Sequence, residues 1–257
     1  MALSDHLREL RARIVRATIV LVIAVLVMLY FYQDLYELVL RPYKDAREQI
    51  DPSTKTEPVL NGVTSGLMFQ LKLCGVAGIV ASSPYWLYQI WAFILPGLHP
   101  NERKWSRIFA AVAGPLFFLG VAVGYYVLPK AIAVLIGFTP EGVTNLVEFT
   151  DFFSFISRML LIFGIAFEIP LFVIMLNLAG IVSGRALGRY RPWIIIGTFV
   201  FAAVGTPSTD PFSMLFLAIP MLVLFLLAEV IARLVDRARG RNRDSTDQWA
   251  DDEVSPL

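Results

Sequence analysis

Two short charged segments carry the residues of this chain that are best suited to bind a charged ligand. Each places one glutamate among arginines at the mouth of a long apolar run: Glu9 lies in segment 6–13, and Glu102 lies in segment 93–104. The two oxygens of a carboxylate match the planar donor fork of a guanidinium in a way that they do not match the ammonium of lysine. Together the two glutamates predict a site for an arginine-bearing ligand.

Each glutamate also has an ordinary structural explanation. Glu9 precedes Arg13 by four residues, so the two can form an exposed helical ion pair worth about 0.3 to 0.5 kcal/mol. Glu102 can pair with Arg103 or Lys104 at the surface. For either glutamate alone the structural explanation is favoured, and the ligand site therefore rests on the occurrence of both.

Glu168 is a third candidate, because it lies inside the apolar stretch 163–170. An ionised carboxylate in the interior of a membrane is costly unless it is hydrated or paired. We expect Glu168 to face a cavity or a partner, either as a protonated group bonded to another helix or as part of a functional polar patch. Gln70, Lys72 and Arg158 are possible polar neighbours.

The elements that position these residues are predicted to be membrane helices. The chain has 257 residues, of which 57% are hydrophobic and 17% are charged, a composition typical of membrane proteins. The apolar runs predict an all-α bundle of six spans, near 14–33, 67–91, 107–128, 154–180, 193–206 and 212–231. We assign 1–232 to this membrane domain and 233–257 to a polar tail that its charge pattern predicts to be disordered.

The basic residues predict that both termini are cytoplasmic. On the side of the amino terminus lie Arg8, Arg11, Arg13, Arg16, Arg103, Lys104, Arg107, Arg185, Arg189, Arg191, Arg233, Arg237, Arg239, Arg241 and Arg243. The opposite side has Arg41, Lys44, Arg47, Lys55 and Lys130, and Lys72 and Arg158 lie near the outer ends of helices. Cytoplasmic loops carry the excess of lysine and arginine, so the side of the amino terminus is the inner one.

Prolines and one short run predict a curved bundle. Four of the spans contain a proline that removes a backbone hydrogen bond and favours a kink: Pro84, Pro115, Pro170 and Pro220. The fifth run, 193–206, is too short to cross about 30 Å of hydrocarbon as a helix. We expect the bilayer to thin locally beside the turn at 206–211. In the outer loop 34–65, a short helix is predicted near 41–50.

Catalytic chemistry lacks the residues that it needs. Cys74 is the only cysteine, the two histidines His6 and His99 lie at the inner surface without a buried serine in the same run, and Asp210 stands alone near an outer turn. No HExxH motif, Cys-X-X-Cys pair or phosphate-binding glycine loop occurs. We therefore predict neither an enzyme nor a cofactor or metal site.

Five ordered motifs resemble those of the TatC family, the multispanning receptor subunit of the twin-arginine protein translocase. They are HLRELRAR at 6–13, PYWLYQIWAFILPGLHPNERK at 84–104, FGIAFEIP at 163–170, RPW at 191–193 and TPSTDPFSMLFLAIPM at 206–221. The resemblance covers nearly the whole chain. It implies a cup-shaped six-helix bundle in a bacterial-type inner membrane that binds twin-arginine signal peptides of folded proteins. It also implies assembly with single-span TatA and TatB subunits into an oligomeric complex, and export driven by the proton gradient.

The same resemblance implies roles for individual residues. The signal-binding positions correspond to Glu9, Arg11, Phe93, Pro96, Leu98, Glu102 and Arg103. Glu168 corresponds to an acid of the concave face, Asp210 to the outer turn before the last span, and Pro42 to a proline of the outer loop. Pro84 and Pro170 are expected to be structural. Where some relatives have a glutamine that contacts the partner helix, this chain has Met214, which implies docking by packing.

Two other functions fit part of the sequence. A proton-coupled secondary transporter of a small solute would use Glu168 as its proton site and Pro84 and Pro170 as hinges. It leaves the paired surface glutamates and the short fifth span unexplained, and the chain has no internal repeat of the kind that many transporters have. A passive scaffold for other membrane subunits would differ from the receptor only in lacking the arginine-binding site.

Overall fold

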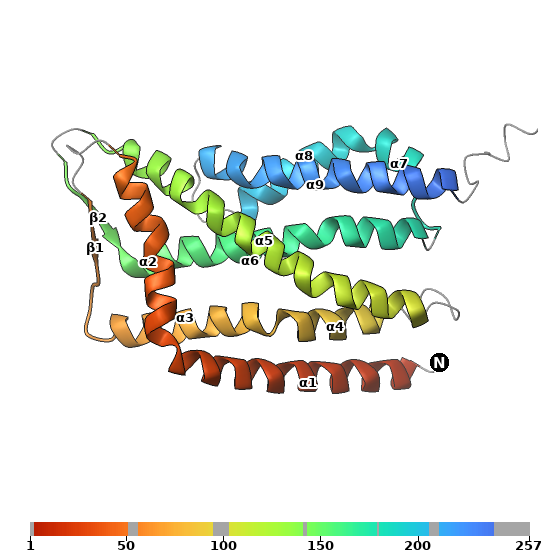
Figure 1. The fold of residues 1–257 in the computed structure, drawn as a ribbon, viewed down its shortest axis with the longest axis horizontal. Helices are drawn as coiled ribbons and strands as arrows, with labels where there is room; N and C mark the ends of the chain where they lie inside the picture. The colour runs from red at the N-terminus through yellow and green to blue at the C-terminus, as the bar shows by residue number, and fades with distance from the viewer. Residues whose placement is uncertain are drawn as a thin grey trace, which may run out of the picture.

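The chain folds into an elongated bundle that is almost entirely helical. This computed structural model describes residues 3–50, 56–94, 103–140, 143–178, 180–205 and 211–238. The helices α1, α6 and α9 and the pair α3 and α4 run along the long axis, while α5 crosses obliquely and α2 lies across one end (Figure 1). We name the end with α2 the cap end. The opposite end, where the amino terminus and the end of α9 lie, is the amino end.

Two short strands interrupt the succession of helices in the described part of the chain. The elements are, in order, α1 (Leu3–Tyr30), α2 (Tyr32–Glu48), β1 (Thr56–Val59), α3 (Ser65–Ala81), α4 (Ser83–Ile94), α5 (Arg103–Gly137), β2 (Asn145–Glu148), α6 (Phe149–Leu178), α7 (Gly184–Arg189), α8 (Arg191–Gly205) and α9 (Pro211–Ala238). Successive long elements alternate in direction, so that the start of α1, the end of α4 and the end of α9 all lie at the amino end (Figure 1).

Four to five elements are long and apolar enough to cross a membrane. The helices α1, α5, α6 and α9 each qualify alone, and α3 and α4 qualify together with a bend of 54° between them. Pro84 is the second residue of α4, so the break predicted in this run is confirmed at the proline. The run predicted to be short forms α8, which has only 15 residues.

Aromatic side chains and close helix crossings form the core. The ring of Phe69 on α3 lies 4.7 Å from that of Phe149 and 5.2 Å from that of Phe153, which are both on α6. Farther along, α5 crosses α6 at Gly120, where an added Cβ would lie 2.5 Å from the carbonyl oxygen of Phe163. A side chain at position 120 would force these helices apart, because packed interiors leave no room for it.

The cap end differs from the predicted outer loop. Instead of a short helix at 41–50, α2 begins at Tyr32, and its buried residues Val39, Pro42, Tyr43 and Ala46 form one helical stripe that covers the bundle. The strands β1 and β2 pair in parallel, with Thr56 opposite Asn145, and the hydroxyls of Tyr43 and Thr56 hydrogen-bond at 3.0 Å. Because the two strands are far apart in the sequence, no local sequence pattern predicts that they pair.

The last helix extends past the predicted start of the polar tail. The sequence predicts this boundary after residue 232, but α9 continues to Ala238. Asp236 in this extension is only 4% exposed, so packing holds the polar sequence in the helix. The predicted disorder is wrong for residues 233–238, and residues 239–257 lie outside the described part of the chain.

Candidate functional site: the amino end of the bundle

Glu9 lies on the first turns of α1, where Arg13 links it to α4. The Arg13 guanidinium donates from Nε and Nη2 to Glu9 Oε1 at 3.0 and 2.5 Å, and Nη1 donates to the Gln89 side-chain oxygen at 3.3 Å. The helical ion pair foreseen from the spacing is therefore formed. Within the described residues Glu9 Oε2 accepts no hydrogen bond, and the Glu9 side chain keeps 34% of its exposure. One carboxylate oxygen remains available to a ligand.

An apolar groove, with Leu10 and Arg13 in its lining, runs between α1 and α4. Its volume is about 570 Å³. The lining is contributed by Leu10, Arg13, Ile14, Ala17, Thr18 and Leu21 of α1, by Ile79 of α3, and by Trp86, Gln89, Ile90, Phe93 and Ile94 of α4. Such a groove can accept an extended or helical apolar segment whose charged end stays near Glu9.

The structure brings together three more of the predicted signal-binding positions at the amino end. Arg11 is exposed on α1, Phe93 lines the groove on the last turn of α4, and Arg103 is the first residue of α5. Pro96, Leu98 and Glu102 lie outside the described residues, as does Asp210. Of the predicted pair of glutamates, the structure therefore describes Glu9 and not Glu102.

Glu168 is buried in α6 beside the bent span. The residue is 9% exposed, and neither of its carboxylate oxygens has a hydrogen-bond partner in the described part of the chain. The indole N–H of Trp91 on α4 faces the Glu168 carboxyl as a side-chain donor, although the two groups do not meet with regular hydrogen-bond geometry. No described hydrogen bond links Glu168 to Gln70, Lys72 or Arg158, so none of these predicted neighbours satisfies it.

The remaining predicted residues have structural surroundings. Pro42 and Pro170 lie inside α2 and α6, and both are buried. Pro84 packs against α5, since an added Cβ at Gly114 would lie 2.9 Å from the Pro84 Cβ. Met214 of α9 is partly buried against the main core of the chain itself. Among the described residues, no cluster of His, Cys, Asp and Glu is suited to hold a metal ion.

Comparison with known proteins decides the family. Residues 5–220 match the family model described as Sec-independent protein translocase protein (TatC). The chain belongs to the TatC family. It is 41% identical over 266 residues to the TatC protein of Frankia casuarinae, covering all of this chain and 73% of the relative. The TatC protein of Escherichia coli K12 is 34% identical over 243 residues, with 94% of this chain and 92% of the relative covered.

Solved structures agree with this assignment. A crystal structure of a TatC protein described as a twin-arginine translocase receptor matches with a TM-score of 0.77 and 30% sequence identity. The match covers 90% of this chain and all of the other. TatC proteins are subunits of a protein translocase and not enzymes, and multiple apolar helices make this chain a multi-pass membrane protein.

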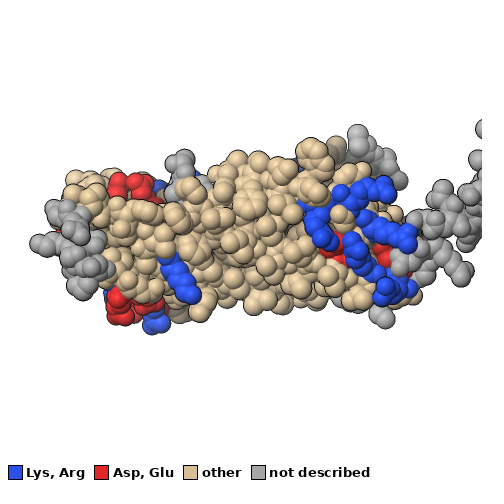
Figure 2. Space-filling view, turned by 90° about the horizontal axis from the view of Figure 1, so that it is seen from above, with Lys and Arg blue, Asp and Glu red and all other residues tan. Residues whose placement is uncertain are grey.

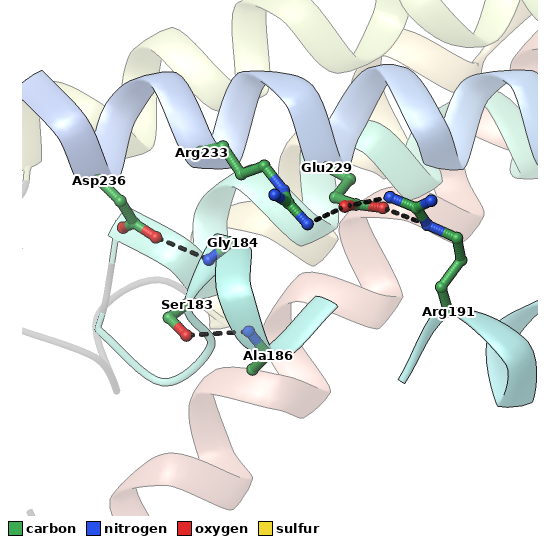
Figure 3. Close-up of polar contacts among 7 residues, drawn as sticks. All are labelled: Ser183, Gly184, Ala186, Arg191, Glu229, Arg233 and Asp236. Atoms are coloured by element: carbon green, nitrogen blue, oxygen red, sulfur yellow. Dashed lines mark hydrogen bonds and ion pairs between the residues drawn. The ribbon is translucent and has the colours of Figure 1, made fainter. Parts of the chain in front are cut away.

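One polar cluster of this TatC family member was missed by the sequence analysis. Glu229 of α9 is only 2% exposed and accepts from Arg191 Nε at 3.1 Å and from Arg191 Nη2 at 2.7 Å. Arg233 Nη2 lies 2.7 Å from Glu229 Oε1 (Figure 3). The four-residue spacing of Glu229 and Arg233 was visible in the sequence, but the third member comes from α8 and no local pattern points to it.

A second buried carboxylate joins α7 to α9. Asp236 Oδ2 accepts the backbone N–H of Gly184 at 2.6 Å, and Oδ1 accepts from the Asn177 side chain at 2.8 Å. Beside it, the Ser183 hydroxyl accepts the N–H of Ala186 at 3.1 Å and caps α7 (Figure 3). These bonds fix the connection between α6 and α8 on the last turns of α9.

Proposed function

We propose that this chain is the receptor subunit of a twin-arginine translocase and that its amino end binds the signal peptide of folded export substrates. The observation that carries the proposal is the groove between α1 and α4 with Glu9 beside its mouth. Glu9 holds Arg13 through Oε1 and leaves Oε2 without a described partner, so an incoming guanidinium can bind without displacing Arg13. Such charge-assisted bonds contribute about 1.5 to 3 kcal/mol each.

The second guanidinium of the signal binds Glu102. Glu102 immediately precedes α5, whose first residue is Arg103, and the start of α5 lies at the same end of the bundle as the start of α1 (Figure 1). Arg11, Pro96 and Leu98 complete the surroundings of the arginine pair. The apolar part of the signal follows Phe93 into the groove, where burial of its side chains contributes about 25 cal/mol per Å².

The receptor has six spans with both termini in the cytoplasm of a bacterial-type cell. The pair of α3 and α4 is one bent span and α8 is a short one, which makes an even number of crossings. In support, the start of α1 and the end of α9 lie at the same end (Figure 1), and lysine and arginine side chains gather there (Figure 2). The bundle is cupped, and the bilayer thins beside the short α8.

Single-span subunits of the TatA and TatB type bind to this receptor and complete an oligomeric translocase that uses the proton gradient. Glu168 and Asp210 supply polar contacts to these partners, and Met214 docks a partner helix by packing. The buried and unbonded carboxyl of Glu168 supports this role, because a partner that offers a donor would satisfy it.

A peptide-binding measurement tests the receptor function. The full chain in lipid nanodiscs is titrated with a labelled twin-arginine signal peptide and with its twin-lysine version. We expect tighter binding of the twin-arginine peptide, and a loss of about tenfold in affinity for Glu9→Gln and for Glu102→Gln. The control is Glu48→Gln, an exposed glutamate of α2 at the cap end, which should bind as the unchanged protein does. Equal binding of both peptides would refute the receptor function.

The buried Glu168 also favours a second candidate, a proton-coupled transporter of a small solute. Proteoliposomes with an imposed pH gradient and an internal pH dye distinguish the two. A transporter would carry protons at a rate that Glu168→Gln abolishes, whereas the receptor should retain twin-arginine binding in this variant and carry no measurable proton current by itself.

A further inference from the structure

A basic pocket lies between α7 and the last turns of α9, apart from the groove at α1. Its volume is about 320 Å³, and it is lined by Arg185, Val230, Arg233, Leu234, Asp236 and Arg237. Four of these residues, at 230, 233, 234 and 237, share one face of α9 because their spacing follows the helical repeat. We propose that this pocket binds the phosphate of an anionic phospholipid, whose acyl chains lie along α9.

Three guanidiniums from two helices supply the phosphate ligands. Arg185 of α7 and Arg237 of α9 are exposed, and the Arg233 side chain is 50% exposed although its Nη2 is paired with Glu229. Lysine and arginine side chains gather over this part of the surface (Figure 2). The planar donor fork of arginine suits two phosphate oxygens at once, so the pocket favours an anionic headgroup over one with no net charge.

The one acid in the lining is turned toward the protein. Asp236 is 4% exposed, and its two oxygens accept from Gly184 N and from Asn177 Nδ2 (Gly184 in Figure 3). These bonds hold the first turn of α7 against α9. The approach is close, since an added Cβ at Gly184 would lie 2.7 Å from Arg233 Cγ. The carboxylate therefore assembles the pocket in advance of binding, which lowers the entropy cost of ordering it.

An apolar stripe distinguishes a lipid from a free anion as the occupant. Val230 and Leu234 are 54% and 58% exposed. The stripe continues along α9 through Ile219, Val223 and Leu227, which are 55%, 52% and 52% exposed. A phospholipid whose phosphate contacts the arginines can lay its acyl chains on this stripe, as expected where basic pockets meet the membrane surface. Inorganic phosphate has no acyl chains and would not contact this stripe.

Native mass spectrometry of the full chain in detergent tests the site. The protein is titrated with phosphatidylglycerol and with phosphatidylcholine of the same acyl chains. We expect the unchanged protein to prefer phosphatidylglycerol, and Arg185→Gln/Arg237→Gln to lose at least about tenfold in affinity for it. The matched control is Arg41→Gln/Arg47→Gln, two exposed arginines of α2, which should leave the affinity unchanged. Equal losses in both pairs, or no loss in the first pair, would overturn the site.

Two further measurements separate the alternatives. Leu234→Ser keeps every arginine and alters an exposed side chain, so the variant should fold normally. Its affinity for phosphatidylglycerol should still fall about threefold, and an unchanged affinity would overturn the acyl contact. Inorganic phosphate is added as competitor at millimolar concentration, and we expect it to leave the lipid bound. Full displacement would identify a pocket for free anions and overturn the lipid proposal.

Discussion

Glu9 and Glu229 are both helical glutamates with an arginine four residues later, yet their surroundings differ in one decisive respect. Glu9 uses only Oε1 in its described bonds and keeps 34% of its side-chain exposure. Glu229 uses both oxygens, toward Arg191 and Arg233, and its side chain is 3% exposed. Identical residue types at identical spacing therefore form an incomplete pair at α1 and a completed cluster at α9.

This difference separates a glutamate that can bind a ligand from a glutamate that stabilises the fold. A carboxylate whose acceptors are all occupied inside the protein gains little from a ligand, and its loss leaves guanidiniums without a partner. A carboxylate with one oxygen exposed contributes little to folding but can accept a ligand donor at once. We therefore expect substitutions in the Glu229 cluster to lower the stability of the fold, and substitutions at Glu9 to lower ligand affinity.

The largest effect is expected for Glu229→Gln. The amide is uncharged and keeps only one acceptor oxygen, so it places an NH₂ group against an arginine donor, and the helices α8 and α9 lose their charged link. We expect the free energy of unfolding to fall by about 2 to 3 kcal/mol, measured by thermal unfolding in detergent. Glu37→Gln, an exposed glutamate of α2, is the control. A change no larger than that of the control would remove the distinction between the two glutamates.

Asp236→Asn should have a somewhat smaller effect. One of the two donors that face Asp236, Gly184 N–H or the Asn177 amide, would then meet an NH₂ group in place of an oxygen. We expect a loss of about 1 to 2 kcal/mol and earlier proteolysis near α7 during partial unfolding. Asp45→Asn changes an exposed aspartate of α2 and should do neither. Normal protease resistance near α7 would argue that other contacts hold this helix.

Arg191→Lys tests the geometry of the Glu229 cluster, because it keeps the positive charge and removes the planar pair of guanidinium donors. Arg191 donates from two nitrogens to the two oxygens of Glu229, which a single ammonium cannot reproduce. About 1 kcal/mol of stability should be lost, again by thermal unfolding. Arg189→Lys alters the exposed last residue of α7 and should be neutral. If the two variants behave alike, charge alone accounts for the Arg191 contact.

Patterns local in sequence predicted most of the fold. Long apolar runs predicted α1, α5, α6 and α9, Pro84 predicted the break between α3 and α4, and the shortage of apolar residues predicted the short α8. The cap was predicted poorly. Its α2 is stabilised by covering the bundle end despite Pro42 in its interior, and the pairing of β1 with β2 joins segments far apart in sequence.

In the candidate site, too, local contacts were predictable from the sequence and contacts between distant segments were not. The spacing of Glu9 and Arg13 predicted their ion pair, whereas the bond from Arg13 to Gln89 and the groove depend on how α4 packs against α1. Glu229 and Arg233 were readable as a pair, but Arg191 reaches them from 38 positions away in the sequence. Where a charge finds its partner through tertiary packing, periodicity and spacing carry no information about the partner.

The smallest effect on stability is expected at Glu9, together with the clearest effect on binding. Glu9→Gln and Arg13→Gln break the same partly exposed ion pair, and the loss of this pair should lower the free energy of unfolding by no more than about 0.5 kcal/mol in each variant. Their effects on twin-arginine peptide binding should be opposite. Glu9→Gln removes the negative charge and one of the two acceptor oxygens and so weakens binding, while Arg13→Gln frees Oε1 beside the available Oε2 and preserves or strengthens it. Equal weakening by both variants would mean that the intact pair, and not the spare carboxylate oxygen, is what the signal peptide requires.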